Sequence, residues 1–573
     1  MARRAGDRLP ARERWWIGLL LAGCAFLDLY RLGAGSLWDQ DETRYAQTAV
    51  EILTTGDPIT LHVNGQAWYV HPPFYMWLVA VTGRFMGFTE FSVRIWSALF
   101  SILGVYATVL LGRALFGNRI GLLAGAVLAV TLQYLAQSRL AVFDTVLLAW
   151  MLLAFYAFYR GYQRGGRTDY LRFFLFVGLA TLTKGPIGLL LPAMIIIPFV
   201  TIRRAWGRWR EVPWAAGLAV YAVVGLSWYV VETVLHGRAF IASVFGYYTF
   251  GRFFGVVESQ SGPWYYYVPV VLFGAFPWTT FWPAAAAFHL RRLRADGSLL
   301  ALLGCGVTFA FYSAAGTKLP NYVLPLYPFA ALAVAALWEP AIERRSAGRT
   351  IGVSLALLVG LLAALGWAIA HYVGGRYPDQ FHMLGHILVY PGLAVAVGLA
   401  IVLSLAARGR VLAAFVALCA TMGAVWIGIL TWIMPIVEDQ KPIKPLALAI
   451  KNALGPGDRI VAYRLGLDTS LIFYTNHHVE WVETPEALRG AVCAPGMVFL
   501  VITREDLATL PGGVPPVLRP FAEHRGTTVL VKPGSARCAS AGRYPDGRRS
   551  SLRRPASARA PARIWRRVAN TPS

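Results

Sequence analysis

The residues best suited to chemistry lie in one short charged segment near the N-terminus. It reads Asp41-Glu42-Thr43-Arg44-Tyr45 and follows the first apolar stretch of a chain that is 57% hydrophobic and only 14% charged. A carboxylate such as Asp41 can orient or deprotonate an acceptor, and a guanidinium such as Arg44 can hold a phosphate through two hydrogen bonds. The alternative interpretation is a helix cap with an Asp41–Arg44 ion pair, which stabilises a helix little. We therefore predict a site for chemistry here.

A second candidate residue lies at the start of a later apolar stretch. The segment Tyr69-Val70-His71-Pro72-Pro73 precedes that stretch, and proline is favoured in the first turn of a helix. His71 would then lie near a helix N-terminus, where anions are favoured. A histidine that only caps or packs against the helix is the alternative. We expect His71 to contact an anionic group.

Basic residues next to turns form a third group. Arg139 and Asp144 begin an apolar segment, and an acidic group there is costly unless it is paired, so we expect Arg139 to pair with Asp144. Two lysines stand in tight turns, within Thr-Lys-Gly-Pro and Gly-Thr-Lys-Leu-Pro-Asn-Tyr. A cationic rim of this kind suits a lipid-phosphate or pyrophosphate-like headgroup. The rim would consist of Arg44, Arg139, Lys184, Arg252 and Lys318.

The composition indicates a polytopic α-helical membrane protein. A soluble protein would carry about a quarter charged residues, well above the 14% found in these 573 residues. The net charge of +24 could suggest nucleic acid, but the arginines stand in short clusters between apolar runs, as topogenic signals do. The five scattered cysteines support neither a metal cluster nor a disulfide framework. No nucleic acid partner is expected.

Thirteen apolar segments are long enough, or nearly long enough, to cross a bilayer. They lie near 15–31, 91–113, 119–136, 140–159, 171–183, 186–202, 213–231, 265–289, 298–315, 322–338, 351–373, 386–407 and 412–434. The first is interpreted as a retained anchor rather than a cleaved signal peptide. The arginine clusters place the N-terminus in the cytoplasm and the region after Pro435 outside.

With this orientation, the candidate residues all emerge at the external face. A channel or carrier more often keeps its ionisable residues near the middle of the membrane. Convergence at one face instead suits a reaction at the bilayer surface. A lipid-carrier flippase or transporter remains the alternative from another functional class.

The composition changes after the last apolar segment, and this change divides the chain into three parts. We predict a transmembrane part over 1–435 with a first external loop over 32–90, a small external α/β domain over 436–532, and a basic disordered tail over 533–573. Within the α/β domain, helices are expected at Pro442–Leu454 and Pro485–Val492. Strands are expected at Arg459–Tyr463, Leu471–Tyr474, Met497–Ile502 and Thr527–Val531.

The order of motifs resembles the ArnT-like, or PMT-type, GT-C membrane glycosyltransferases. Asp-Glu-x-Arg-Tyr-Ala at 41–46 is followed by Gly-Asp, Asn-Gly and x-Pro-Pro, and then by Arg139 and Asp144. Thr-Lys-Gly-Pro at 183–186, Gly-Pro-Trp-Tyr-Tyr-Tyr at 262–267 and Lys-Leu-Pro-Asn-Tyr-Val-Leu-Pro at 318–325 continue the likeness. The resemblance covers residues 15–532.

This resemblance implies a GT-C fold and an activity. Such enzymes transfer a sugar, usually with inversion, from a polyprenyl-phosphate (undecaprenyl-phosphate) carrier to a lipid, glycan or protein acceptor at the periplasmic face of the bacterial inner membrane. Asp41 matches the key carboxylate, and Asp144 matches the second acidic position. Arg44 and Lys318 match positions associated with the lipid phosphate, and Tyr322 lies in the same motif. The other substrate-binding candidates are Glu42, Tyr45, His71, Arg139 and Lys184.

The chain departs from the aminoarabinose transferases in two places. These typically carry Glu-Lys-Pro-Pro where this chain has Val70-His71-Pro72-Pro73, and a histidine where Ser259-Gln260-Ser261 stands. The glutamate implicated in a metal site is thus missing, and we expect neither a metal nor a cofactor. The expected acceptor is lipid A or another cell-envelope component. A protein O-glycosyl (mannosyl) transferase of the same family is the alternative enzyme.

Overall fold

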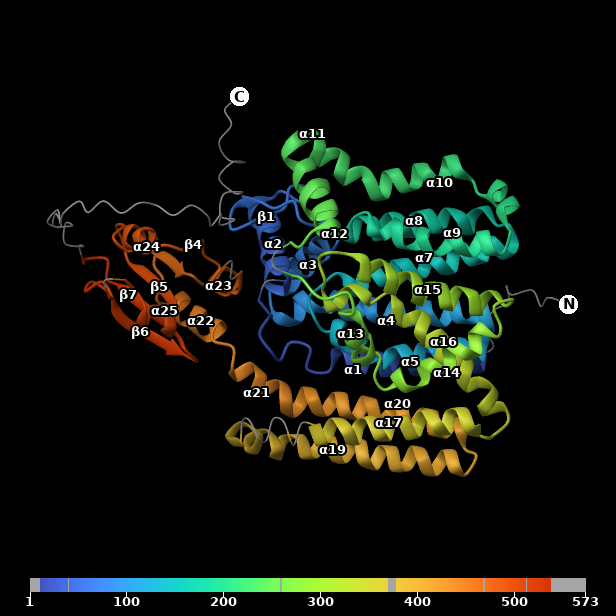
Figure 1. The fold of residues 1–573 in the computed structure, drawn as a ribbon. Coiled ribbons are helices and arrows are strands. Elements are labelled where there is room, and N and C mark those ends of the chain that lie inside the picture. Colours follow the sequence, from blue (N-terminus) through green and yellow to red (C-terminus); the bar gives the residue numbers. More distant parts are fainter. Residues whose placement is uncertain are drawn as a thin grey trace, which may run out of the picture.

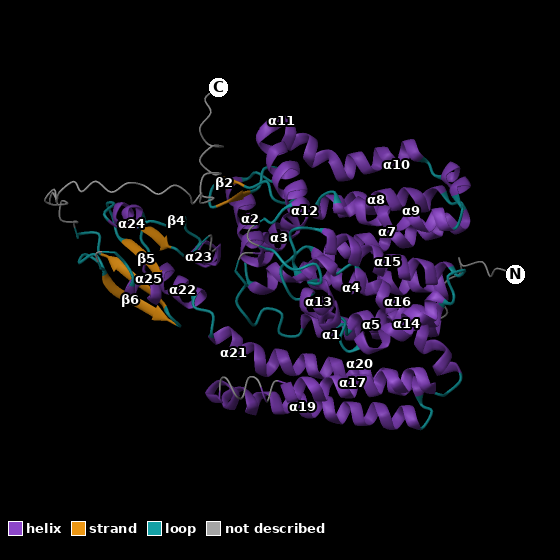
Figure 2. Ribbon diagram, viewed as in Figure 1, coloured by secondary structure: helices purple, strands orange, loops and turns teal. Residues whose placement is uncertain are grey.

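The computed structural model describes residues 11–39, 41–257, 260–368, 371, 378–466, 469–511 and 513–536. It consists of a large helical bundle and a smaller α/β unit, which lies beyond one end of the bundle (Figure 1). Strands are nearly confined to the α/β unit (Figure 2). The expected basic tail falls almost entirely in 537–573, outside the described residues.

The helices of the bundle follow one another with short connections. They are α1 (Ala11–Leu29), α2 (Asp41–Thr55), α3 (Phe74–Met86), α4 (Glu90–Phe116), α5 (Asn118–Ala129), α6 (Leu132–Gln137), α7 (Asp144–Arg164), α8 (Arg167–Lys184), α9 (Ile187–Ile202), α10 (Trp214–Tyr221), α11 (Ser227–Ile241), α12 (Arg252–Phe254), α13 (Tyr267–Gly274), α14 (Trp282–Leu290), α15 (Asp296–Ala314), α16 (Leu326–Glu343), α17 (Gly348–Ala368), α19 (Pro378–Ala407), α20 (Val411–Gly428) and α21 (Met434–Asp439).

Each of the thirteen expected apolar segments overlaps one or more of these helices. Among the described residues, six helices are long and apolar enough to cross a membrane, or seven if the bent pair Tyr267–Gly274 and Trp278–Leu290 counts as one span. Several others are shorter apolar helices. The chain is therefore a membrane-embedded helical protein, and the number of spans stays a prediction.

Local sequence signals explain how α8 ends at the candidate site. Gly185 has a φ of 87°, a backbone conformation that side chains with a Cβ rarely adopt. Its N–H donates to the Thr181 carbonyl at 2.8 Å, which closes the last turn of α8. Pro186 then precedes α9. Lys184 is thus fixed at the carboxyl end of α8.

The segment between α2 and α3 is anchored by a buried glutamate. It contains a two-stranded hairpin, β1 (His62–Val63) and β2 (Gln66–Ala67), with Asn64 and Gly65 in its turn. Glu51 of α2 accepts hydrogen bonds from the N–H groups of Asn64 at 2.6 Å and Gly65 at 2.9 Å. The loop that leads to His71 is therefore tied back to the helix that carries Asp41.

The α/β unit has a five-stranded mixed sheet between helices. Its elements are α22 (Ile443–Ala453), β3 (Arg459–Tyr463), α23 (Thr469–Thr475), β4 (Val479–Val482), α24 (Pro485–Val492), β5 (Val498–Thr503), α25 (Arg504–Ala508), β6 (Arg519–His524) and β7 (Thr527–Lys532). The strand order is β4-β3-β5-β7-β6, with β3 parallel to β4 and β5 and with β7 antiparallel to β5 and β6. Ile460 and Ala462 pack on the α22 and α23 side, whereas Val461 and Tyr463 pack on the α24 side.

Most of the expected elements of this unit are present, but one was assigned wrongly. Leu471–Tyr474 was expected to be a strand, and it forms part of the helix α23. All seven residues of α23 are buried, so its apolar run lacks the polar face that would distinguish a helix from a strand. Strands β4 and β6 were not expected. Cys493 is disulfide-bonded, which corrects the expectation from the cysteine spacing.

The α/β unit packs against the helix that begins with Asp41. The hydroxyls of Thr43 in α2 and Thr469 in α23 are hydrogen-bonded at 2.6 Å, and the N–H of Leu37 donates to the Tyr474 hydroxyl at 2.8 Å. Residues of α2, α3, α22 and α23 belong to one continuous hydrophobic core. The start of α2 is therefore held between the bundle and the α/β unit.

Candidate functional site

A cavity of about 300 Å³ is lined by the segment before α3, by the junction of α8 and α9, and by parts of 228–254 and 311–322. Its polar lining includes His71, Lys184, Arg252 and Tyr322, and most of the remaining lining residues are aromatic or aliphatic. Four separate segments of the sequence contribute these side chains. The cavity therefore combines two cations with an apolar wall, which suits an anionic amphiphile.

The lysine of this cavity is held by one ion pair and two aromatic rings. Lys184 forms an ion pair with Asp144, whose other carboxylate oxygen accepts a hydrogen bond from Asn321 Nδ2 at 2.9 Å. Lys184 Nζ also lies 5.0 Å from the centre of the Phe143 ring and 5.1 Å from that of Tyr322. These contacts fix the ammonium at the cavity wall.

Arg139 does not pair with Asp144, which corrects the sequence expectation. Its Nη1 donates to the carbonyls of Leu27 at 3.1 Å and Asp28 at 2.7 Å, at the end of α1. Arg139 lies in the turn before α7, whereas Asp144 is the first residue of the helix, so the two face different elements. Closeness in sequence therefore pointed to the wrong partner.

Arg252 is the second cation of the cavity. Its Nη1 donates to the Tyr322 hydroxyl at 3.2 Å, and its guanidinium lies 5.7 Å from the centre of the Tyr248 ring. Its backbone carbonyl accepts the N–H of Thr317 at 3.1 Å, and the Thr317 hydroxyl donates to the Gly255 carbonyl at 3.1 Å. The turn that precedes Tyr322 thus positions Arg252 as well.

Asp41 lies at the N-terminus of α2, and the charges of Lys184 and Arg252 affect the pKa of its carboxyl. Burial raises the pKa of its carboxyl above the usual 3.8, Arg44 opposes this shift, and Asp144 adds to it. The charges of Lys184 and Arg252 also lower this pKa. The side chain retains accessible surface. Neighbouring protein nevertheless displaces much of the bulk water around the carboxylate. Among the described residues, no ion pair joins Asp41 to Arg44.

Aromatic rings surround His71. The centre of its ring lies 4.7 Å from that of Phe143, 5.8 Å from that of Trp68 and 6.0 Å from that of Tyr45. Burial lowers the pKa of His71 well below 6.5, and the cations Arg252, Lys184 and Arg44 lower it further. His71 is therefore neutral at pH 7 and can offer a hydrogen bond but no charge. Burial also raises the pKa of Tyr45 well above 10.0, so this phenol keeps its proton.

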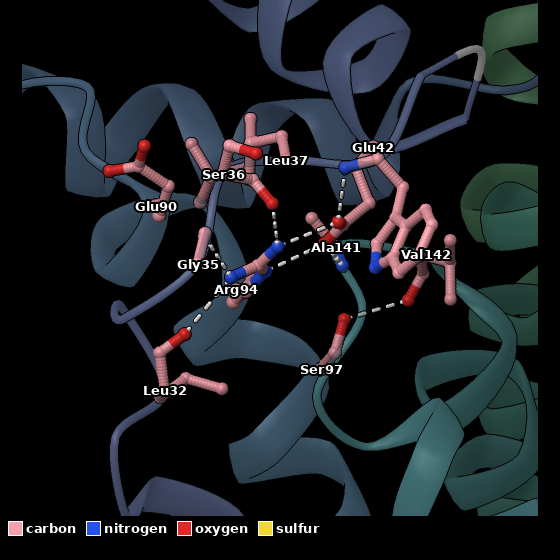
Figure 3. A network of polar contacts seen from close by, with 12 residues as sticks. Leu32, Gly35, Ser36, Leu37, Glu42, Glu90, Arg94, Ser97, Ala141 and Val142 are labelled. Carbon is pink, nitrogen blue, oxygen red and sulfur yellow. Dashed lines mark hydrogen bonds and ion pairs between the residues drawn. The ribbon is translucent and has the colours of Figure 1, made fainter. Parts of the chain in front are cut away.

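Glu42 belongs to a buried polar network that includes Arg94 (Figure 3). Arg94 Nε and Nη2 each donate to one carboxylate oxygen of Glu42 at 2.8 Å. The same carboxylate accepts the N–H groups of Trp38 at 2.8 Å and Ala141 at 2.6 Å. Arg94 uses its remaining N–H groups on carbonyls of the 32–36 loop. Glu42 thus joins the start of α2 to α4 and to the turn before α7.

Lys318 is not among the residues that line the cavity. Its Nζ donates to the carbonyls of Ser313 at 2.8 Å and Ala315 at 2.7 Å, which closes the carboxyl end of α15. Burial lowers the pKa of Lys318 from 10.5. The structure therefore brings Lys184 and Tyr322 together with His71 at the cavity. By contrast, Arg139 and Lys318 donate to backbone carbonyls, and Glu42 binds Arg94 and two backbone N–H groups.

Two residues of the site, Asn321 and Arg252, carry little signal in the sequence. Asn321 belongs to the motif at 318–325, and Arg252 belongs to the predicted cationic rim, but neither is among the predicted site residues. A single asparagine or arginine in a loop carries little signal by itself, and both gain meaning from the residues they contact. In the described part of the chain, no group of three His, Cys, Asp or Glu side chains is placed to hold a metal ion.

Comparisons with known proteins identify the fold and the family. Residues 70–230 match a family model described as dolichyl-phosphate-mannose-protein mannosyltransferase. The chain is 32% identical over 408 residues to an undecaprenyl phosphate-alpha-4-amino-4-deoxy-L-arabinose arabinosyl transferase of Pseudomonas aeruginosa, covering 68% of this chain and 72% of the relative. A transferase of the same name from Shewanella sediminis is 30% identical over 368 residues, covering 61% and 64% of the two chains.

The crystal structure of ArnT from Cupriavidus metallidurans bound to undecaprenyl phosphate superposes with a TM-score of 0.78 at 22% identity, over 91% of this chain and 98% of that one. The same ArnT in the apo state also gives a TM-score of 0.78, at 20% identity over 92% and 99% of the two chains. The fold is therefore the GT-C fold of membrane-embedded glycosyltransferases. Within that class, the chain belongs to the ArnT-like family.

Proposed function

We propose that this protein is an inverting glycosyltransferase that moves a sugar from an undecaprenyl-phosphate carrier to lipid A or another cell-envelope acceptor. The observation that carries the proposal is a single cavity that combines Lys184, Arg252 and an apolar wall, close to the carboxylate of Asp41. The names of the relatives support the carrier and the sugar-transfer reaction.

The two parts of the carrier lipid match the two parts of the cavity. Leu190, Val244 and Phe250 lie on its apolar side, and Phe254 is 80% exposed and thus available to the membrane. A polyprenyl chain would bury its surface there, while the phosphate would take charge-assisted hydrogen bonds from the lysine and the arginine. The hydrogen bond from Arg252 to the Tyr322 hydroxyl would orient the guanidinium toward that phosphate.

Asp41 acts on the acceptor in this proposal. For a hydroxyl acceptor, the carboxylate takes the proton as the acceptor oxygen attacks the anomeric carbon. A new C–O bond forms on one side of that carbon while the C–O bond to the phosphate breaks on the other, which inverts the configuration. The departing polyprenyl phosphate is stabilised by Lys184 and Arg252, so little acid catalysis is required. A phosphate acceptor is already anionic and needs positioning more than deprotonation.

The other candidate residues take supporting roles. Arg44 stands one turn from Asp41 and adds positive charge for the phosphate or the acceptor. Tyr45 and His71 provide an aromatic, uncharged wall. Asp144 orients Lys184. The backbone contacts of Glu42, Arg139 and Lys318 favour roles in holding the loops that carry the site.

The cellular arrangement follows from the charge pattern. We propose that the protein lies in the bacterial inner membrane with its N-terminus in the cytoplasm and the catalytic end in the periplasm. Residues 1–435 would form the GT-C catalytic domain and residues 436–532 a periplasmic domain, followed by the basic tail over 533–573. Packing of the α/β unit on α2 is consistent with this division.

A transfer assay tests the proposed function. The purified full-length protein is incubated with radiolabelled polyprenyl-phosphate sugars and envelope extract in the presence of EDTA. We expect the label to move to a lipid acceptor with release of polyprenyl phosphate. Label on protein would favour the related protein O-glycosyl transfer. No transfer from any donor, together with movement of labelled carrier across proteoliposome bilayers, would favour a transporter.

A further inference from the structure

A second cavity is lined in part by Arg94 of the Glu42–Arg94 network. It has a volume of about 430 Å³ and shares no lining residue with the candidate site. Its walls come from the loop after α1, the turn after α6, the α20–α21 region and Lys441. Arg94, whose contacts with Glu42 are drawn in Figure 3, also lines this second cavity.

The charged lining of this second cavity is predominantly positive. Arg94 is balanced by Glu42, and Glu438 is balanced by Lys441, whose Nζ lies 3.4 Å from its carboxylate. This leaves Arg31 and Arg139 as further cations of the lining, and of these Arg139 lies close to the buried acid Asp28. The Arg31 side chain makes no hydrogen bond or ion pair with any residue that the structure describes. Arg139 uses only Nη1 on the described residues, on two carbonyls.

A buried donor in the same lining also lacks a partner. Trp426 is 8% exposed, and its indole Nε1 has no hydrogen-bond partner among the described residues. A buried N–H without an acceptor costs free energy unless a ligand or water satisfies it. The backbone of Arg31, in the same lining, is strained, because its φ of 53° is unusual for a residue with a Cβ. Strain of this kind is concentrated at functional sites.

The apolar residues of this lining indicate an amphiphilic ligand. Leu430 and Met434 line the cavity beside Trp426, and all three lie on the 411–439 helical stretch, which is long and apolar enough to span a membrane. An acyl chain could therefore follow this stretch into the bilayer while an anionic headgroup meets the arginines. Glu438 would repel that anion, but it accepts the Ser36 N–H at 2.9 Å and is paired with Lys441.

From these contacts we propose that the second cavity binds the phosphate headgroup of an anionic membrane phospholipid. Arg31, Arg139 and Trp426 Nε1 supply the donors, and the α20–α21 region receives the acyl chain. A lipid at this position would reinforce the junction between α1, α21 and the α/β unit, next to the helix that carries Asp41. This site is separate from the proposed transfer reaction.

Native mass spectrometry of the delipidated full-length protein tests this site. The protein is titrated with phosphatidylglycerol and, separately, with phosphatidylcholine. We expect one phosphatidylglycerol to bind more tightly than phosphatidylcholine. Arg31→Gln and Trp426→Phe should each weaken it by about tenfold, since each removes one donor to a charged group. Arg84→Gln is the matched control, because this exposed arginine on α3 lies outside the cavity.

The outcomes separate the possible ligands. Competition by millimolar inorganic phosphate would support recognition of the phosphate group. Equal binding of the two lipids, or unchanged binding by both cavity variants with normal melting temperatures, would overturn the proposal. Displacement of phosphatidylglycerol by stoichiometric lipid A or undecaprenyl phosphate would assign the cavity to a substrate instead. None of these readouts depends on sugar transfer.

Discussion

Asp144, the first residue of α7, and Lys184, the last residue of α8, form an ion pair at the wall of the cavity. Asn321 holds the second oxygen of the carboxylate at 2.9 Å, so the acid is fixed from two sides. The ammonium is thereby presented between the Phe143 and Tyr322 rings. The Lys184 ammonium is therefore oriented before a phosphate enters the cavity. Binding would then cost little conformational entropy of the lysine side chain.

Removing the lysine should affect both binding and stability. Lys184→Met is expected to weaken donor binding and to destabilise the fold by about 3–5 kcal/mol, because a buried carboxylate loses its partner. The double variant Asp144→Asn with Lys184→Met should regain much of the stability but not the binding. Melting temperature and donor affinity, measured side by side, distinguish the two effects. Recovery of binding in the double variant would contradict a direct role for Lys184.

The Glu42–Arg94 pair should matter for stability far more than an exposed pair. Glu42→Gln leaves a buried guanidinium without its counter-charge, and we expect a loss of about 3–5 kcal/mol in the free energy of unfolding. Glu211→Gln is the control, because the Glu211–Arg208 pair is 38% and 45% exposed. That change should cost about 1 kcal/mol or less. Similar melting temperatures for the two variants would argue against the structural role of Glu42.

The turn before Lys318 should be sensitive to a single methyl group. A Cβ at Gly316 would lie 2.5 Å from the Gly255 carbonyl oxygen, so Gly316→Ala should displace the segment that carries Arg252. We expect weaker donor binding with little change in the rest of the bundle. Gly306→Ala on α15 is the control, because a methyl group there would have no neighbouring atom within 4 Å. Equal donor affinity for both variants would remove Arg252 from the proposed site.

The pH dependence should separate Asp41 from His71. Asp41 must be ionised to accept a proton, and its pKa is raised above 3.8, so transfer to a hydroxyl should increase as the pH rises through that raised value. His71 has a depressed pKa, so its neutral form stabilises the fold above pH 6.5, and this stability is lost as the pH falls below 6.5. His71→Gln should therefore keep the acid limb of activity and lose less stability than the wild type between pH 7 and 5.

If the acid limb of the pH–activity profile disappears in His71→Gln, the group that titrates is His71 and not Asp41. The melting temperatures of both proteins across the same pH range provide the control. If the wild type and His71→Gln lose stability in parallel on acidification, the depressed pKa of His71 makes no contribution to the pH dependence of stability.

The sequence predicted the class of fold, because the apolar segments and their basic flanks are strong signals. It also predicted that Asp41 and Lys184 would emerge at the same face, and the charge of Lys184 does act on Asp41 across 143 positions of sequence. Pairings were harder to predict. Arg139 was matched to Asp144 by proximity in sequence, whereas the fold turns it toward the end of α1.

The division between structural and site residues could not be read from residue types. Glu42 and Asp41 are adjacent acids on one helix, yet successive positions point about 100° apart, so one enters the buried network and the other does not. Lys318 was expected at the phosphate because of its motif, but two carbonyls at the end of α15 hold its ammonium. Such distinctions depend on contacts between distant segments.

The most direct test of the central claim compares the wild type with Asp41→Asn in single-turnover transfer from a polyprenyl-phosphate sugar to the acceptor found in the envelope assay. If that acceptor is a hydroxyl, the variant should fold with an unchanged melting temperature and bind the donor normally. It should then transfer sugar at least about 100-fold more slowly, since it lacks a base. Transfer at the wild-type rate would contradict the account.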